Sequence, residues 1–138
     1  MSEISVPISA GELLDKITIL RIKQRRITDP SKLANVRKEL RALERVWRTA
    51  VRQPVQDAEA QLTQVNEALW NIEDHIRDEE RRKEFGARFV ELARQVYFTN
   101  DRRAEIKRDI NLRLGSLLIE EKSYQAYAPE TRSVTSRL

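Results

Sequence analysis

Polar and charged side chains cluster in the segment YFTNDRRAEIKRDIN, residues 97–111, where they interrupt an apolar pattern typical of a buried helix face. The apolar residues on either side keep one helical spacing: Phe85, Phe89, Leu92 and Val96 before the cluster, then Ile106, Ile110 and Leu114 after it. Between them, the same face falls on Thr99 or Asn100 and then on Arg103. Buried polar side chains cost stability unless they are paired. The interruption therefore indicates either a layer that fixes helix register or a binding site.

The residue types in this cluster suit a small anionic ligand. Arginine and lysine bind phosphate and carboxylate groups through charge-assisted hydrogen bonds, and neighbouring amide and carboxylate side chains can fix a ligand's orientation. The predicted anion-binding residues are Arg102, Arg103 and Lys107, and the predicted orienting residues are Asn100, Asp101 and Asn111. A sugar phosphate, a nucleotide sugar or a carboxylate is the ligand class that we expect for such a site.

A purely structural layer is the alternative, and the pattern favours it. A single buried Asn can fix register and oligomeric state in a coiled coil. The apolar stripe resumes in phase at Ile106 and Ile110, as it would if Asn100 and Asp101 belonged to one continuous helix interface. The two alternatives differ in whether Asn100 faces a partner helix or a cavity.

Three charged residues near the N-terminus, Glu12, Asp15 and Lys16, are further binding candidates. Glu12 and Lys16 are spaced as a helical i,i+4 pair, and acidic residues in a first turn interact favourably with the helix dipole. Because this is a complete structural explanation, the sequence assigns these residues no catalytic role.

Several kinds of catalytic chemistry find no support in the sequence. The chain has no Cys, and Gly11, Gly86 and Gly115 are isolated, so thiolate nucleophiles and glycine-rich phosphate loops are excluded. The only histidine, His75, lies among acidic residues in WNIEDHIRDEE without a zinc-binding spacing, which is more typical of a solvated helix face. We therefore expect no metal and no cofactor, and a binding role is favoured over an enzymatic one.

Helix signals place these residues in an all-α protein. Ser9-x-x-Glu12 matches a capping box, and Asp29-Pro30 ends the first helix and opens the second. Apolar stripes predict helices over 9–28, 30–53, about 56–84 and 87–114, with breaks at Pro54 and Phe85–Gly86 and with Gly115 as the residue after the last helix. We expect an antiparallel four-helix bundle, or paired helical hairpins, in which the long last helix bends at Thr99–Asp101 or projects beyond its partners.

Length and composition predict one helical domain over residues 1–122 and a loosely held tail over 123–138, with Tyr124 and Tyr127 as anchors. No apolar run approaches a membrane span, and the first residues do not have the features of a secretory signal. Together with the lack of Cys, this favours a cytoplasmic location.

Charge is distributed unevenly along the chain. Residues 21–52 carry a balance of +8, from eleven Lys and Arg against Asp29, Glu39 and Glu44, and residues 56–84 carry −5, from nine acids against four bases. Opposite signs favour pairing of the second and third helices, within or between chains, although two solvated faces would give the same pattern. Arg37, Arg41, Arg45, Arg48 and Arg52 form a cationic strip that could contact nucleic acid. Nucleic-acid binding is the less favoured alternative, since the strip lacks interleaved aromatic residues and the acidic helix competes for it.

The narrow apolar stripes favour a helical assembly or protein-interaction module, either a homodimer whose second copy completes the core or a complex with another protein. Segments 6–27, 33–43, 69–80 and 85–127, most specifically TNDRR and EEKSY, resemble a bacterial family of small proteins of unknown function that occur alone or beside glycosyltransferase-type domains. That resemblance implies no activity. It places in the signature segments Glu12, Asp15, Lys16, Asn35, Asn100, Asp101, Arg102, Lys107, Asn111, Lys122 and Tyr124.

Overall fold

The computed structural model describes residues 2–127, and in this range it contains four helices and no strand. The helices are α1 (Ala10–Arg26), α2 (Pro30–Ala50), α3 (Gln56–Arg82) and α4 (Ala87–Arg113). The prediction of an all-α fold is confirmed. The last part of the predicted tail, residues 128–138, lies outside the described range.

Two predicted helix starts are present in the structure. The Ser9 hydroxyl accepts a hydrogen bond of 3.2 Å from the Glu12 N–H at the start of α1. The Asp29 carboxylate accepts one of 2.9 Å from the Lys32 N–H, and Pro30 occupies the first position of α2. Each cap satisfies a backbone N–H group that has no partner inside its helix.

The ends of α3 and α4 differ in how well their sequence suits the turn. Gly115 follows α4 with a φ of 63°, and the next N–H, of Ser116, donates a hydrogen bond of 2.8 Å to the Asn111 carbonyl, as predicted for a glycine at this position. After α3, Lys83 takes the left-handed conformation with a φ of 57°, at a cost of about 1–2 kcal/mol for a residue with a Cβ atom. The turn therefore begins earlier than the predicted Phe85–Gly86, and Gly86 serves as the N-cap of α4.

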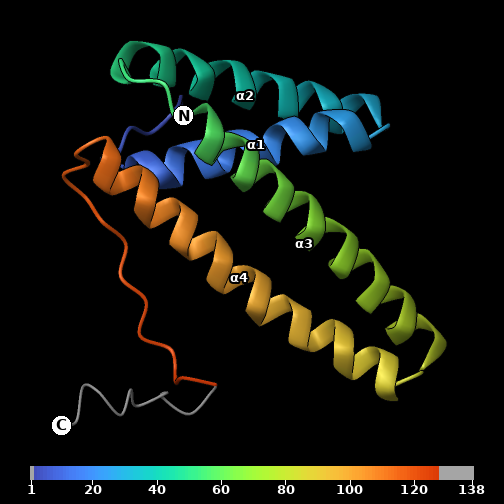
Figure 1. Cartoon of the computed structure of the whole chain (residues 1–138). Helices are drawn as coiled ribbons and strands as arrows, with labels where there is room; N and C mark the ends of the chain where they lie inside the picture. Colours follow the sequence, from blue (N-terminus) through green and yellow to red (C-terminus); the bar gives the residue numbers. More distant parts are fainter. Residues whose placement is uncertain (1, 128–138) are drawn as a thin grey trace, which may run out of the picture.

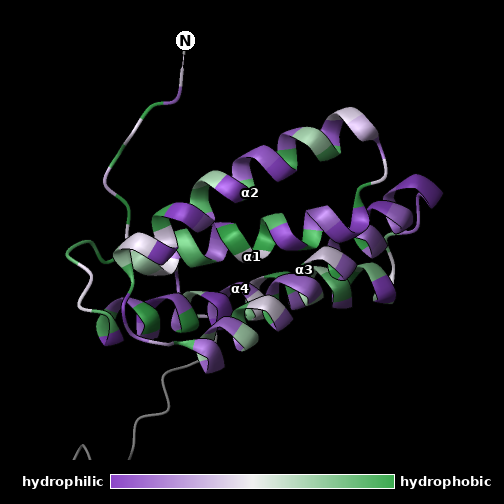
Figure 2. Ribbon diagram, turned by 90° about the horizontal axis from the view of Figure 1, so that it is seen from above, coloured by the Kyte–Doolittle hydropathy of each residue, from purple (hydrophilic) through white to green (hydrophobic). Residues whose placement is uncertain are grey.

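The helices form two antiparallel hairpins that cross each other, with α1–α2 lying across one end of α3–α4 (Figure 1). Helix α1 is central and contacts all three other helices, whereas α2 contacts only α1. One apolar cluster joins α1 to α2 through Leu13, Ile17, Leu20, Val36 and Leu40. A second joins α1 to α3 and α4 through Leu14, Val55, Ala58, Leu62, Ile106 and Ile110. Viewed from above, hydrophobic and hydrophilic residues alternate along the helices (Figure 2).

Pairing of the basic second helix with the acidic third helix within the chain does not occur, because α2 and α3 are on opposite sides of α1. The acids of α3 contact α1 instead: Glu59 pairs with Arg21, and Glu67 pairs with Arg25 and Arg26. The central position of α1 therefore leaves the outer face of α2 without a covering helix in residues 2–127.

Helix α4 runs without interruption through Thr99–Asp101. Its N-terminal half and the C-terminal half of α3 project beyond the α1–α2 hairpin (Figure 1), which is the second of the two predicted outcomes. None of the described helices has an apolar stretch long enough to cross a membrane.

Candidate functional site

The N-terminus of α1 packs closely on the C-terminal half of α4. A Cβ atom added to Gly11 would lie 2.4 Å from the Lys107 carbonyl oxygen, so glycine is needed for this approach. The Gly11 N–H donates a hydrogen bond of 2.6 Å to the buried Asn111 side chain, and the Ala10 N–H donates one of 3.2 Å to the Ser116 hydroxyl. Asn111 and Ser116, which follow about one hundred positions later in the sequence, therefore cap the first turn of α1.

Asp15 is the centre of a buried polar network, with only 1% of its surface exposed. Its carboxylate accepts two hydrogen bonds from Arg103, one of 2.9 Å from Nε and a second from a terminal nitrogen. The Asn66 amide, on α3, donates to the same carboxylate over 2.9 Å and to the Thr18 hydroxyl over 3.0 Å. Three helices are thus joined by hydrogen bonds to one buried charge, an arrangement in which every partner contributes to satisfying that charge.

Lys107 lies beside this network and is almost as buried, with 7% of its surface exposed. Its ammonium group is 2.7 Å from Glu12, 3.4 Å from Glu120 and 3.9 Å from Asp15. Burial opposes the charged form, but the hydrogen bond to Glu12 and the charges of Asp15, Glu12 and Glu120 together raise the pKa of Lys107. Hydrogen bonds to Asp15, opposed by burial, likewise raise the pKa of Arg103. Both residues therefore stay positively charged.

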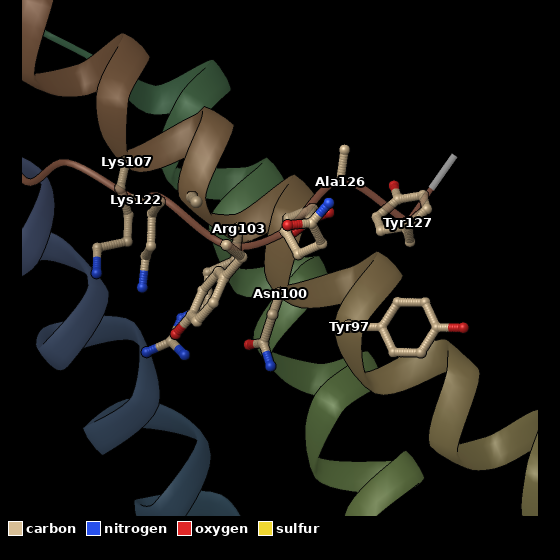
Figure 3. Close-up of a pocket in the computed structure, with 11 residues that line it drawn as sticks. Tyr97, Asn100, Arg103, Lys107, Lys122, Ala126 and Tyr127 are labelled. Atoms are coloured by element: carbon tan, nitrogen blue, oxygen red, sulfur yellow. The ribbon is translucent and has the colours of Figure 1, made fainter. Parts of the chain in front are cut away.

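A cleft of about 1010 Å³ opens on the outer side of this network, between α4 and the segment over residues 122–127. Figure 3 shows that Arg103, Lys107 and Lys122 project to the same side of the cleft and that Asn100 lies near them. All three tyrosines of the chain line it, Tyr97 from α4 and Tyr124 and Tyr127 from the later segment. The remaining lining residues are Asn100, Asp101, Arg103, Ala104, Lys107, Lys122, Gln125 and Ala126.

Aromatic contacts hold the later segment against α4. The Tyr127 ring packs on Tyr97 and Phe98, with centroids 5.4 Å and 4.9 Å apart. Reduced solvation and the nearby Asp101 carboxylate raise the pKa of Tyr127, so its hydroxyl stays protonated and available as a donor at neutral pH. Because Tyr97, Tyr124 and Tyr127 are each more than 40% exposed, their rings remain accessible to a ligand.

The predicted candidates fall into three groups. Asn100, Asp101, Arg103 and Lys107 line the cleft. Glu12, Asp15 and Asn111 lie behind it and hold Lys107, Arg103 and the first turn of α1.

Two candidates point elsewhere. Arg102 is exposed and pairs with Glu105 over 3.3 Å, and Lys16 is exposed and pairs with Glu12 over 3.9 Å. Neither Arg102 nor Lys16 lines the cleft.

Other residues of the site were not among the predicted candidates. Asn66 follows Leu62 by four positions, so helical spacing could have placed it on the buried face of α3. Tyr97 and Tyr127 join the site only because the chain turns back along α4 after Gly115, and no local pattern predicts that course. Glu120 comes within reach of Lys107 for the same reason.

The described part of the chain offers no evident metal site. His75 is exposed on α3, and residues 2–127 contain no group of three His, Asp or Glu side chains placed to hold an ion. The side chains that line the cleft provide hydrogen bonding, charge and aromatic contact.

The chain belongs to a family of unknown function, DUF6165, whose sequence model matches residues 4–136. Neither a curated protein nor a solved structure matches the chain.

Proposed function

We propose that this member of the DUF6165 family is a binding protein for a small anionic ligand that carries a ring, such as a sugar phosphate or a nucleotide sugar. The observation that supports this best is the cleft at the polar interruption of α4, which gathers all three tyrosines and the cations Arg103, Lys107 and Lys122. Exposed aromatic rings stack on sugars and bases, and cations beside them bind phosphate.

The cations of the cleft differ in how free they are to bind a ligand. Arg103 is paired with Asp15, and Lys107 is paired with Glu12. Both cations are therefore fixed in place and contribute positive charge at the inner side of the cleft. Lys122 pairs with Glu120 over 3.8 Å and lies over the Tyr124 ring, 5.6 Å from its centroid, and its side chain is 45% exposed. Glu120 also contacts Lys107 over 3.4 Å, so a phosphate or carboxylate of a ligand would take the place that Glu120 now holds between the two lysines.

The position of Asn100 favours a site over a structural layer. Asn100 is exposed, lines the cleft and is not part of the network around Asp15, whose members on α4 are Arg103 and Lys107. Asn100 can therefore orient a ligand without disturbing the packing of the helices. No reaction is assigned to the site, because its residues support binding and do not include an activated nucleophile.

A thermal-shift screen against sugar phosphates, nucleotide sugars and carboxylates tests the proposal. A ligand at one hundred times its Kd should stabilise the fold by about 2.7 kcal/mol, a shift of several degrees. Tyr97→Ala and Lys122→Ala should abolish the shift, whereas Arg102→Ala, on the same helix but outside the cleft, should preserve it. Unchanged melting temperatures across the whole panel would contradict the proposal, as would equal shifts in all three variants.

Self-association is a second candidate function, and apolar exposure at one end of the molecule favours it. Ile4 and Val6, before α1, and Leu117 and Leu118, after α4, are each between 48% and 99% exposed, and hydrogen bonding of Ala10 to Ser116 brings their segments together. A second copy that covered these side chains would form a homodimer through the segments before α1 and after α4, instead of through the helix stripes from which a homodimer was predicted. Light scattering at micromolar concentration tests it: a dimer that Leu118→Glu dissociates supports this interface, and a monomer rejects it.

The cytoplasmic location stays a prediction.

A further inference from the structure

The outer face of α2 carries an unusual concentration of cations without carboxylate partners. Helix α2 packs on α1 alone, so its opposite side faces away from the rest of the described molecule (Figure 1). Six cations of α2 and Arg52, two residues after its end, are exposed, and none lies within 4.0 Å of a carboxylate in residues 2–127: Lys32, Arg37, Lys38, Arg41, Arg45, Arg48 and Arg52.

The arginines of α3 differ from those of α2 in having carboxylate partners. Every arginine of α3 pairs with an acid on its own helix: Arg77 with Glu73, and Arg81 and Arg82 with Asp78. Along α2 the only acids are Glu39 and Glu44, and Glu44 is bound to Arg21 on α1. The positive charge of α2 is therefore left unneutralised.

The four arginines of α2 form a straight strip. At 3.6 residues per turn, Arg37, Arg41, Arg45 and Arg48 fall within an arc of about 80° and extend over about 16 Å, and Arg52 follows two residues after the end of the helix. Like charges this close repel one another, so the strip lowers the stability of the isolated helix unless something covers it. Guanidinium groups in a row match the repeated phosphates of a nucleic acid, each of which they can bind bidentately.

We propose that this strip binds the phosphodiester backbone of a nucleic-acid double helix without reading its sequence. A single strand is less suitable, because binding it uses stacking on aromatic rings. The only aromatic residue of α2, Trp47, packs in the apolar core. The strip extends over the length of about ten phosphates of a duplex, counted over both strands, and presents charge alone.

A membrane surface fits this face less well. An amphipathic helix binds a bilayer by burying its apolar side in the lipid. In α2 the apolar side is occupied by α1, through Val36 and Leu40. The half-exposed Val46 lies about 100° or more around the helix from each of the four arginines of α2, so it cannot insert together with them.

Fluorescence anisotropy with the full chain and labelled 20-base-pair duplexes of DNA and of RNA tests the proposal. At 50 mM salt we expect micromolar binding, and the logarithm of the association constant should fall with the logarithm of salt concentration with a slope of about −4, since phosphate contacts by the four arginines of α2 release counterions. A triple variant, Arg41→Gln, Arg45→Gln and Arg48→Gln, should bind at least tenfold more weakly and reduce the slope by about three. DNA and RNA duplexes binding alike would support recognition of the backbone alone, and a preference for one would identify which duplex is the partner.

The matched control removes the same charge from the paired surface of α3, through Arg77→Gln, Arg81→Gln and Arg82→Gln. It should bind like the unmodified chain, with folding of both variants checked by circular dichroism. Equal losses in the two triple variants would show that only net charge matters and would overturn the proposal. So would the lack of binding at 100 μM protein, tighter binding to a single strand of the same length, or binding to phosphatidylserine vesicles but not to duplexes.

Discussion

At the crossing of α1 with α4, Arg103 and Lys107 each contact a carboxylate on another helix, whereas the cations of α2 contact none in residues 2–127. The two regions contain the same residue types and lie on opposite sides of α1 (Figure 1). At the crossing, the carboxylate that Arg103 contacts is almost completely buried, so each charge there depends on its partner. On α2 the positive charges are exposed and have no carboxylate partner within residues 2–127.

This difference separates cations that hold the fold from cations that are available to a partner. A charge count of the two segments cannot make the distinction, because it records sign and not environment. Substitutions that remove one positive charge should therefore have very different effects on stability in the two regions, and measuring both is the direct way to test the comparison.

The largest effect is expected for Arg103→Ala. It would leave the Asp15 carboxylate, 1% exposed, without its main partner. Loss of one partner of a buried ion pair costs about 3–5 kcal/mol, and we expect about 3 kcal/mol because Asn66 and Lys107 remain near. Urea denaturation measures it, with Arg102→Ala as the exposed control on the same helix. A loss below about 1 kcal/mol would show that the crossing does not depend on this pair.

Gly11→Ala should weaken the same crossing by steric means. The added Cβ atom would lie 2.4 Å from a backbone carbonyl, so α1 and α4 must separate, at a cost of about 1–3 kcal/mol. Gly86→Ala should cost less, since nothing lies within 4 Å of its Cβ position. Thermal unfolding of the two variants compares them, and an equal loss would contradict the close approach of the helices.

Alkaline pH tests whether the charge of Lys107 stabilises the crossing. Its pKa is raised in the folded state, so its stabilising effect is complete below the ordinary value of 10.5 and is lost as pH rises through the folded value. Arginine remains charged in this range. The free energy of unfolding of Lys107→Arg should therefore fall less than that of the unmodified chain between about pH 10 and 12. Parallel curves would mean that the pairing of Lys107 does not contribute.

The smallest effect is expected for Arg45→Ala on α2. Exposed substitutions away from specific contacts change stability by less than about 0.5 kcal/mol, and Arg45 has no ion pair in the described residues. A slight gain would fit relief of repulsion along the strip. A loss as large as that of Arg103→Ala would remove the distinction between the two regions.

The sequence by itself determined the local structure. Apolar spacing gave the helices, and Ser9, Asp29-Pro30 and Gly115 marked helix ends, because capping depends on groups within a few residues of one another. It also located the polar interruption of α4, from which Arg103 and Lys107 reach the crossing. The end of α3 at Lys83 is an exception. Lysine is not a residue type that predicts the left-handed conformation that it adopts here.

Only the tertiary structure decided what the polar residues do. Asp15 meets Asn66 and Arg103 across separations of 51 and 88 residues, which no periodic pattern encodes. Asn100 and Arg103 differ by about 60° around α4, so spacing allows either to face α1. The close approach of α1 at Gly11 selects Arg103 for the buried network and leaves Asn100 to the cleft. The same packing places α1 between α2 and α3, because α1 has apolar residues on two faces and can bury both only in the centre.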